Sequence, residues 1–219
     1  MGWWLDCDEC IQYGRSLGYK EEDDAPGMSG REYVMLRYLG HFIAKMAEAV
    51  TDCGKKPIVW EGFTKYVNEM IPKNVTVMVW DGGYQTAQSL LKEGFQVINC
   101  SWIPNYVVTP VWHYTPRQCY DWDVYSFGSI SESSAYYGST TRIDATENVL
   151  GGQMCVWGDT VGKAFPTLED GLADEHRKVR DRLPFVMENT WNREKIRAFD
   201  RVRDAADGAD ALYGRMIGS

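Results

Sequence analysis

The chain has 219 residues, of which 44% are hydrophobic and 25% are charged, and this balance excludes a disordered or membrane-embedded protein. Its 23 basic and 31 acidic side chains give a net charge of −8. Binding to a nucleic acid backbone needs clustered Lys and Arg, so we expect no nucleic acid partner. No apolar stretch approaches the roughly 20 residues that cross a bilayer, and no export signal opens the chain. We therefore expect a soluble protein without a membrane partner, and favour the cytoplasm.

Short apolar runs rich in Val, Ile and Trp recur along the first hundred residues and once more near residue 150. They do not alternate with polar residues, as is typical of strands buried on both faces of a parallel sheet. The predicted strands are Trp3–Cys7, Pro57–Trp60, Val75–Trp80, Phe95–Cys100 and Val149–Trp157.

Segments with helical periodicity lie between these strands. Arg31 to Val50 places apolar residues along one side, and Thr86 to Leu91 follows the third strand. Strands and helices thus alternate, which predicts an α/β protein with one domain over residues 1–219.

The segment from Val107 to Asn148 is rich in Tyr, Ser and Gly, with a short helical pattern near Thr115–Asp121. Long connections of this kind are usually functional loops. At the end of the chain we predict a helix from His176 to Asn189 that is interrupted at Pro184. A second helix, Arg193 to Tyr213, would follow Asn192 as its N-cap.

Aromatic and acidic residues gather where the predicted strands end. In a (β/α) barrel the active site lies at the carboxyl ends of the strands. The sequence therefore predicts a pocket with aromatic walls and an acidic floor, built from Asp8-Glu9, Trp60-Glu61, Trp80-Asp81, Trp102 to Tyr106 and Trp157-Gly158-Asp159.

The six cysteines include a C-x-x-C pair, Cys7 and Cys10. A structural zinc needs four ligands, and the sequence has no second such pair nearby and only three scattered histidines. We favour no metal and no cofactor, with cysteines that are mostly reduced and buried. A metal-binding or redox module at this pair is the disfavoured alternative.

Several motifs, in order, resemble glycoside hydrolase family 20, the β-N-acetylhexosaminidases. The closest is "NVLGGQMCVWGD" (Asn148–Asp159), which is similar to the eighth barrel strand of that family. The segments "PIVWEGF", "VTVMVWDGG" and "FQVINCSWIPNYVV" are similar to its fifth, sixth and seventh strands, and "WLDCDEC" (Trp4–Cys10) to its fourth. The resemblance implies a (β/α)8 TIM-barrel fold, here a partial barrel that lacks the first three strands.

The resemblance also implies roles for individual residues. Asp8 and Glu9 match the catalytic pair of a substrate-assisted retaining mechanism, in which the 2-acetamido oxygen of the sugar attacks C1. Glu9 would be the general acid and base, Asp8 would accept the acetamido N–H, and Tyr106 would donate to the acetamido oxygen.

The remaining matched positions would bind the sugar. Trp60, Trp80 and Trp157 would enclose it, and Asp159 stands where the family has a Glu that binds sugar hydroxyls. Val108 stands where many members have an Asp that makes a further hydroxyl contact.

The expected function is removal of terminal β-linked N-acetylhexosamine from a glycan. An open arc of five strands leaves unpaired edges, so we expect it to need a complementing N-terminal fragment or a homo-oligomer. The alternative is a truncated remnant that binds carbohydrate without turnover.

Overall fold

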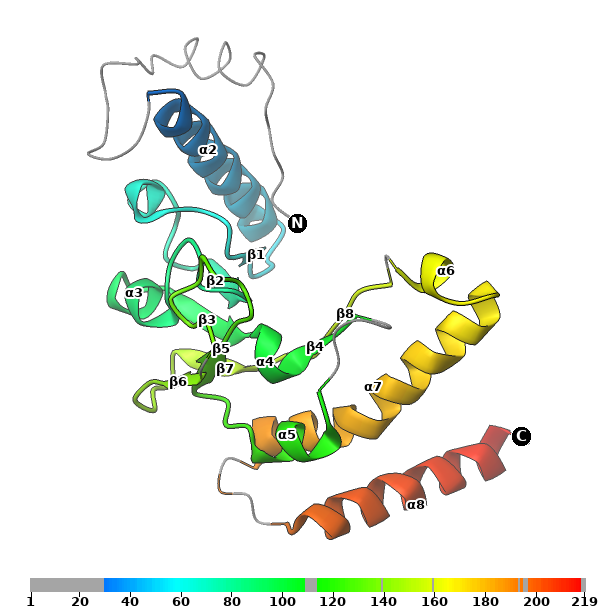
Figure 1. Cartoon of the computed structure of the whole chain (residues 1–219). Helices are drawn as coiled ribbons and strands as arrows, with labels where there is room; N and C mark the ends of the chain where they lie inside the picture. The colour runs from blue at the N-terminus through cyan, green and yellow to red at the C-terminus, as the bar shows by residue number, and fades with distance from the viewer. Residues whose placement is uncertain are drawn as a thin grey trace. The chain divides into compact units, whose positions relative to one another are not determined.

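The computed structural model describes residues 30–108, 114–138, 140–158, 160–192, 194 and 197–217. The predicted strand Trp3–Cys7 lies outside this part of the chain. The described residues form a mixed α/β structure that divides into two compact units (Figure 1). The first holds the described residues up to Val97 together with Ser133–Ala135, and the second holds the rest.

The first unit confirms the alternation expected from the sequence. Its elements are α2 (Gly30–Asp52), β1 (Ile58–Trp60), the short helix η1 (Lys65–Val67), β2 (Thr76–Val79) and α3 (Ala87–Lys92). Strand β3 (Gln96–Asn99) then carries the chain from the first unit into the second.

Strands β1 and β2 are parallel, with Ile58 opposite Thr76 and Trp60 opposite Met78. The four-stranded sheet has the order β1-β2-β3-β7, where β7 spans Val149–Gly152. Val75, Val77 and Val79 are buried on one face of β2, and Thr76 is buried on the other with Met78 half-buried, so the run is largely covered on both faces as its composition predicts.

The core of the first unit is closed by aromatic packing and by a close helix contact. Phe63 meets the edge of Phe95, with the ring centroids 6.2 Å apart, and the Lys73 ammonium lies 3.8 Å from the Phe95 centroid. On α2, a Cβ at Gly40 would lie only 2.8 Å from the Cβ of Val67. The glycine therefore lets α2 approach η1 closely.

The second unit contains more elements, most of them short, and ends in two long helices. They are α4 (Trp102–Asn105), β4 (Tyr106–Val107), α5 (Pro116–Asp121), β5 (Ser126–Gly128), β6 (Thr140–Arg142), β7, β8 (Cys155–Val156), α6 (Val161–Ala164), α7 (Leu168–Trp191) and α8 (Phe199–Ile217). Strands β4 and β8 pair in parallel, and β5 and β6 form an antiparallel pair.

The predicted strand Val149–Trp157 is two strands in two different sheets, β7 and β8. The break falls at Gln153 and Met154, where the Gln153 N–H donates to the carbonyl of Asn99 at 2.9 Å. A continuous apolar run does not reveal such a change of partner, because both halves are equally apolar.

The long connection contains the predicted short helix and a strand pair that the sequence did not predict. Thr115 caps α5 in a capping box with Gln118, and Pro116 takes the first helical position. Strands β5 and β6 follow, within a segment whose Tyr, Ser and Gly content favoured an irregular loop.

The C-terminal helices differ from the prediction at both of their junctions. Helix α7 begins at Leu168, capped by Thr167, and continues through Pro184 to Trp191, so the predicted interruption is wrong. Asn189 fixes α7 beyond the proline, because its side chain donates to the carbonyls of Cys119 and Tyr120 at 2.7 and 3.0 Å.

Asn192 is the C-cap of α7, with its N–H donating to Glu188 O at 2.7 Å, and not the predicted N-cap of the next helix. Helix α8 begins later, at Phe199, and lies beside α7 (Figure 1), where Arg180 forms ion pairs with Asp207 and Asp210.

Three of the four described cysteines are buried as expected, namely Cys100, Cys119 and Cys155. Cys53, directly after α2, is the exposed one among them. All four are free thiols.

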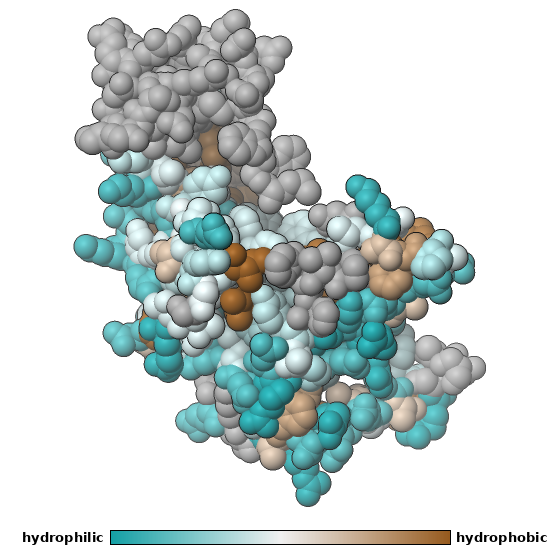
Figure 2. Space-filling view, viewed as in Figure 1, coloured by the Kyte–Doolittle hydropathy of each residue, from teal (hydrophilic) through white to brown (hydrophobic). Residues whose placement is uncertain are grey.

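Hydrophobic side chains are exposed near the start of α7, seen as brown surface beside α6 (Figure 2), and they include Leu168 and Leu172.

Candidate functional site

In the first unit, the ends of β1 and β2 bring together two of the predicted aromatic residues. Trp60 ends β1 and is 40% exposed, whereas Trp80 directly follows β2 and is half-buried. The Trp80 Nε1–H donates to the backbone carbonyl of Glu61 at 2.8 Å, and the Glu61 N–H donates to Met78 O at 2.9 Å. These bonds tie the two strand ends to each other.

The two carboxylates at these strand ends, which the sequence analysis assigned to the acidic floor of a pocket, are buried. Glu61 is 3% exposed and Asp81 is 6% exposed. Both oxygens of Glu61 are directed at the backbone of the segment between β2 and α3, where they accept N–H groups. Burial raises the pKa of the Glu61 carboxyl, and these donors oppose that rise.

In the second unit, Tyr106 lies beside two tryptophans. Its ring stacks on that of Trp102, with centroids 4.4 Å apart and planes 23° apart, and lies 6.4 Å from the Trp157 ring at 30°. The pairing of β4 with β8 sets this arrangement, because Tyr106 is opposite Cys155 and the Trp157 N–H donates to Val107 O at 3.0 Å. Trp157 is 37% exposed, whereas Tyr106 is 4% exposed.

Three predicted site residues, Asp8, Glu9 and Asp159, lie outside the described residues. The structure thus describes four of the predicted residues, Trp60 and Trp80 at the ends of neighbouring strands in one unit, and Tyr106 beside Trp157 in the other.

Sequence reasoning did not single out two residues that shape these strand ends. Trp102 belongs to the predicted segment Trp102 to Tyr106 but carried no role of its own, and the backbone between the two stacked rings is non-helical at Ile103 and Pro104, so helical spacing could not have revealed the stack. For Glu61 the sequence pattern predicts a carboxylate in the pocket floor, and nothing in the local sequence distinguishes that role from an inward one.

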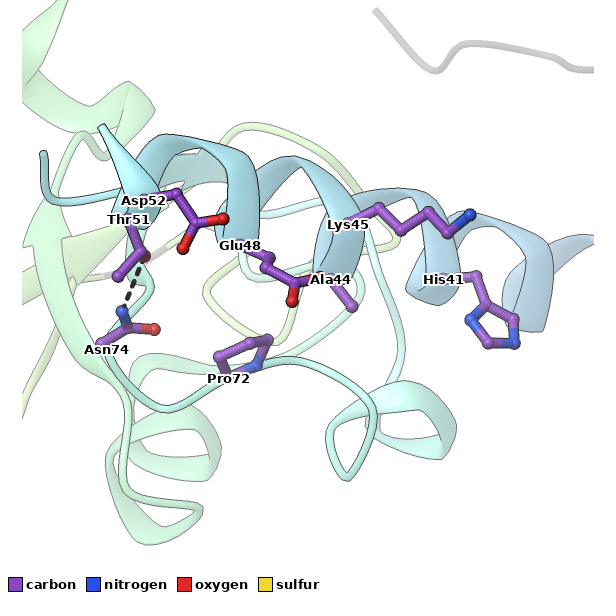
Figure 3. Close-up of a pocket in the computed structure, with 8 residues that line it drawn as sticks. All are labelled: His41, Ala44, Lys45, Glu48, Thr51, Asp52, Pro72 and Asn74. Atoms are coloured by element: carbon purple, nitrogen blue, oxygen red, sulfur yellow. Dashed lines mark hydrogen bonds between the residues drawn. The ribbon is translucent and has the colours of Figure 1, made fainter. Parts of the chain in front are cut away.

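Two surface hollows lie elsewhere. One, of about 450 Å³, is lined by α2 and by Pro72 and Asn74, and Asn74 donates to Thr51 Oγ1 at 3.0 Å there (Figure 3). The other, of about 570 Å³, lies between Val156 and the Leu172 to Val179 turns of α7. Of the predicted site residues that the structure describes, none lines either hollow.

Within the described ranges, no group of three or more His, Cys, Asp or Glu side chains is placed to hold a metal ion. The helices of the same part of the chain include none that is both long and apolar enough to span a membrane.

The fold and the strand ends together define an α/β protein with parallel strands that carry Trp and carboxylate residues at their carboxyl ends. The family model for the glycosyl hydrolase family 20 catalytic domain matches residues 2–169. The chain therefore belongs to glycosyl hydrolase family 20. A search of curated proteins finds no significant match.

Two solved structures have a similar fold. The crystal structure of Dispersin B matches with a TM-score of 0.51 and 17% identity over 71% of this chain. The β-N-acetylhexosaminidase from Bacteroides fragilis NCTC 9343 matches with a TM-score of 0.57 and 15% identity over 97% of this chain. The chain spans 48% of the length of the first and 38% of the length of the second.

Proposed function

We propose that this chain is the C-terminal part of a (β/α)8 barrel, strands four to eight in one domain, and that the completed barrel removes terminal β-linked N-acetylhexosamine from a glycan. The observation that carries the proposal is the family match over residues 2–169, which includes every proposed site residue. The parallel pairing of β1 with β2 and of β4 with β8 supports it.

The proposed reaction is substrate-assisted. The acetamido oxygen attacks C1 while Glu9 protonates the departing glycosidic oxygen, and the bond between C1 and that oxygen breaks to leave an oxazolinium ion. Glu9 then takes a proton from water, the water oxygen bonds to C1, and the bond from C1 to the acetamido oxygen breaks. The product keeps the configuration of the substrate.

Asp8 and Tyr106 would orient the acetamido group during the first step. Asp8 accepts its N–H and stabilises the positive charge that develops on the ring, and Tyr106 donates to its oxygen. The stack of Tyr106 on Trp102 supports this role, because a ring held at 4.4 Å by a neighbour has little freedom to turn.

The sugar would lie against indole faces, since its C–H faces are apolar. Trp60, Trp80 and Trp157 supply those faces, and Asp159 would accept from the sugar hydroxyls. The exposed fractions of Trp60 and Trp157, 40% and 37%, support this, because most core tryptophans would be covered.

The chain spans less than half of either structural neighbour, so we propose that activity needs an N-terminal fragment or a second copy to complete the barrel. The same observation favours the second candidate, a remnant that binds N-acetylhexosamine without turnover.

Release of nitrophenol from a β-N-acetylglucosaminide by the purified chain tests both. Glu9→Gln should abolish turnover, and N-acetylglucosamine-thiazoline should inhibit it, while Glu48→Gln, at an exposed position of α2, is the matched control. Thiazoline binding without turnover would favour the remnant. A folded chain that neither binds the thiazoline nor turns over substrate would overturn the remnant, and the same result after addition of a complementing N-terminal barrel fragment would overturn the hydrolase.

A further inference from the structure

The Glu61 side chain forms an unusual set of contacts with the segment that follows β2. Its Oε2 accepts the N–H groups of Asp81 and Gly82 at 3.2 and 2.8 Å. Its Oε1 accepts those of Tyr84 and Gln85 at 2.9 and 3.4 Å. One buried carboxylate therefore accepts hydrogen bonds from four of the five backbone N–H groups of residues 81 to 85.

These four bonds fix the shape of a tight segment. Gly82 has a φ of +71°, which a side-chain-bearing residue rarely adopts, and the segment leads directly into α3, whose N-cap Thr86 accepts the Ser89 N–H at 3.1 Å. A carboxylate buried this deeply is costly unless its oxygens are hydrogen-bonded. The segment and Glu61 therefore stabilise each other, and neither arrangement is favourable alone.

The same residue also holds the indole of Trp80. Trp80 Nε1 donates to the Glu61 carbonyl at 2.8 Å. The backbone of Glu61 therefore bonds to one end of the stretch from Trp80 to Gln85, and its side chain bonds to the other end. A second support comes from Ser134, whose hydroxyl donates to the Asp81 carbonyl. The position of Trp80 relative to Trp60, the residue before Glu61, depends directly on these contacts.

We propose that Glu61 is a positioning residue, which holds the Trp80–Gln85 segment so that the Trp60 and Trp80 indoles present their faces to an N-acetylhexosamine ring. The inference rests on the proposed function for the identity of the sugar. It assigns Glu61 no contact with the sugar, because its oxygens are occupied by backbone donors.

The test uses the full chain labelled with 5-fluorotryptophan and followed by ¹⁹F NMR, with the Trp80 and Trp60 lines assigned from Trp80→Phe and Trp60→Phe. Glu61→Gln keeps the size of the side chain but turns an N–H₂ toward two of the backbone donors. The Trp80 line should shift or broaden in this variant. Glu61→Asp, one methylene shorter, should give an intermediate shift, and Glu48→Gln should leave the line unchanged.

Titration with N-acetylglucosamine-thiazoline is the second readout. Glu61→Gln should weaken its binding about tenfold, a change of about 1.4 kcal/mol, with partial recovery in Glu61→Asp. A Trp80 line that stays in place in folded Glu61→Gln overturns the proposal. A shifted line with unchanged affinity overturns it as well, since Glu61 would then be structural only.

Failure of the proposed function is separately visible. If wild-type chain does not bind the thiazoline, the sugar assignment is wrong whatever the ¹⁹F lines show. If Glu61→Gln does not fold, hydrogen exchange in the wild type tests whether the backbone N–H groups are bonded to Glu61. The Gly82 and Tyr84 amides should then exchange about 10 to 100 times more slowly than that of exposed Gly83. Equal exchange at the three amides would refute the proposal.

Discussion

The side-chain amides of Asn68 and Gln85 bond to each other twice, Asn68 Nδ2 to Gln85 Oε1 at 2.8 Å and Gln85 Nε2 to Asn68 Oδ1 at 2.9 Å. Both residues are buried, and Gln85 Nε2 donates in addition to the carbonyl of Phe63 at 3.0 Å. The pair joins the residue after η1 to the end of the segment that Glu61 holds.

Replacing one member of this pair should be strongly destabilising. Gln85→Leu leaves the Asn68 amide and the Phe63 carbonyl buried without these partners, so we expect the free energy of unfolding to fall by about 2 to 4 kcal/mol. Urea unfolding measures it. Because the partners share one network, Asn68→Leu combined with Gln85→Leu should lose less than the sum of the two single changes. Additive losses would show that the two amides do not stabilise each other.

Gly152 gives a second prediction, which concerns the Gly-Gly of the family-like motif. A Cβ at Gly152 would lie 2.3 Å from Cη2 of Trp122, a buried ring fixed by its Nε1 bond to Ser126 O at 3.0 Å. Gly152→Ala should therefore reduce the free energy of unfolding by about 1 to 3 kcal/mol. Gly162→Ala, in α6, meets no atom within 4 Å and should be nearly neutral in the same thermal or urea measurement. Equal effects of the two changes would contradict this packing.

The sequence predicted the elements whose signals are local. The helix expected at Arg31–Val50 is α2, and the apolar runs ending at Trp60, Trp80 and Cys100 contain β1, β2 and β3, because continuous Val and Ile runs are typical of doubly covered strands. The continuation of α7 through Pro184 was not predictable, because it depends on contacts with α5 that are distant in the sequence.

The site was predictable in its residue types but not in their orientation. A Trp followed by a carboxylate at a strand end indicates a pocket whether the carboxylate faces a ligand or a loop. The inward direction of Glu61 depends on four N–H groups some 20 residues downstream, and no local pattern encodes them.

The described thiols should differ sharply in reactivity. Burial raises the pKa of Cys119 to about 12, so its reactive thiolate is scarce at pH 8, and its thiol lies 3.7 Å from the Pro104 carbonyl. Cys53 is exposed. In native chain treated with iodoacetamide, peptide mapping should find Cys53 modified long before Cys119, Cys100 and Cys155. Rates that match would contradict the burial of the three, and denatured chain provides the control in which all should react alike.

The buried Glu61 carboxyl should give the protein a pH dependence of a definite sign. Burial raises its pKa in the folded state above the ordinary value of 4.5, so directly above pH 4.5 the native protein holds this proton more tightly than the unfolded chain does. Stability rises with pH only where the unfolded state binds more protons, and here the native state binds more. The contribution of Glu61 is therefore fully present below pH 4.5 and is lost as the pH rises through the folded-state pKa.

Glu61→Gln has no proton to lose, so the difference in free energy of unfolding, wild type minus variant, should fall as the pH is raised across this window. Urea unfolding at a series of pH values measures it, with Glu48→Gln as the parallel control. A difference that rises with pH would mean that the four N–H donors outweigh burial and hold the pKa below 4.5.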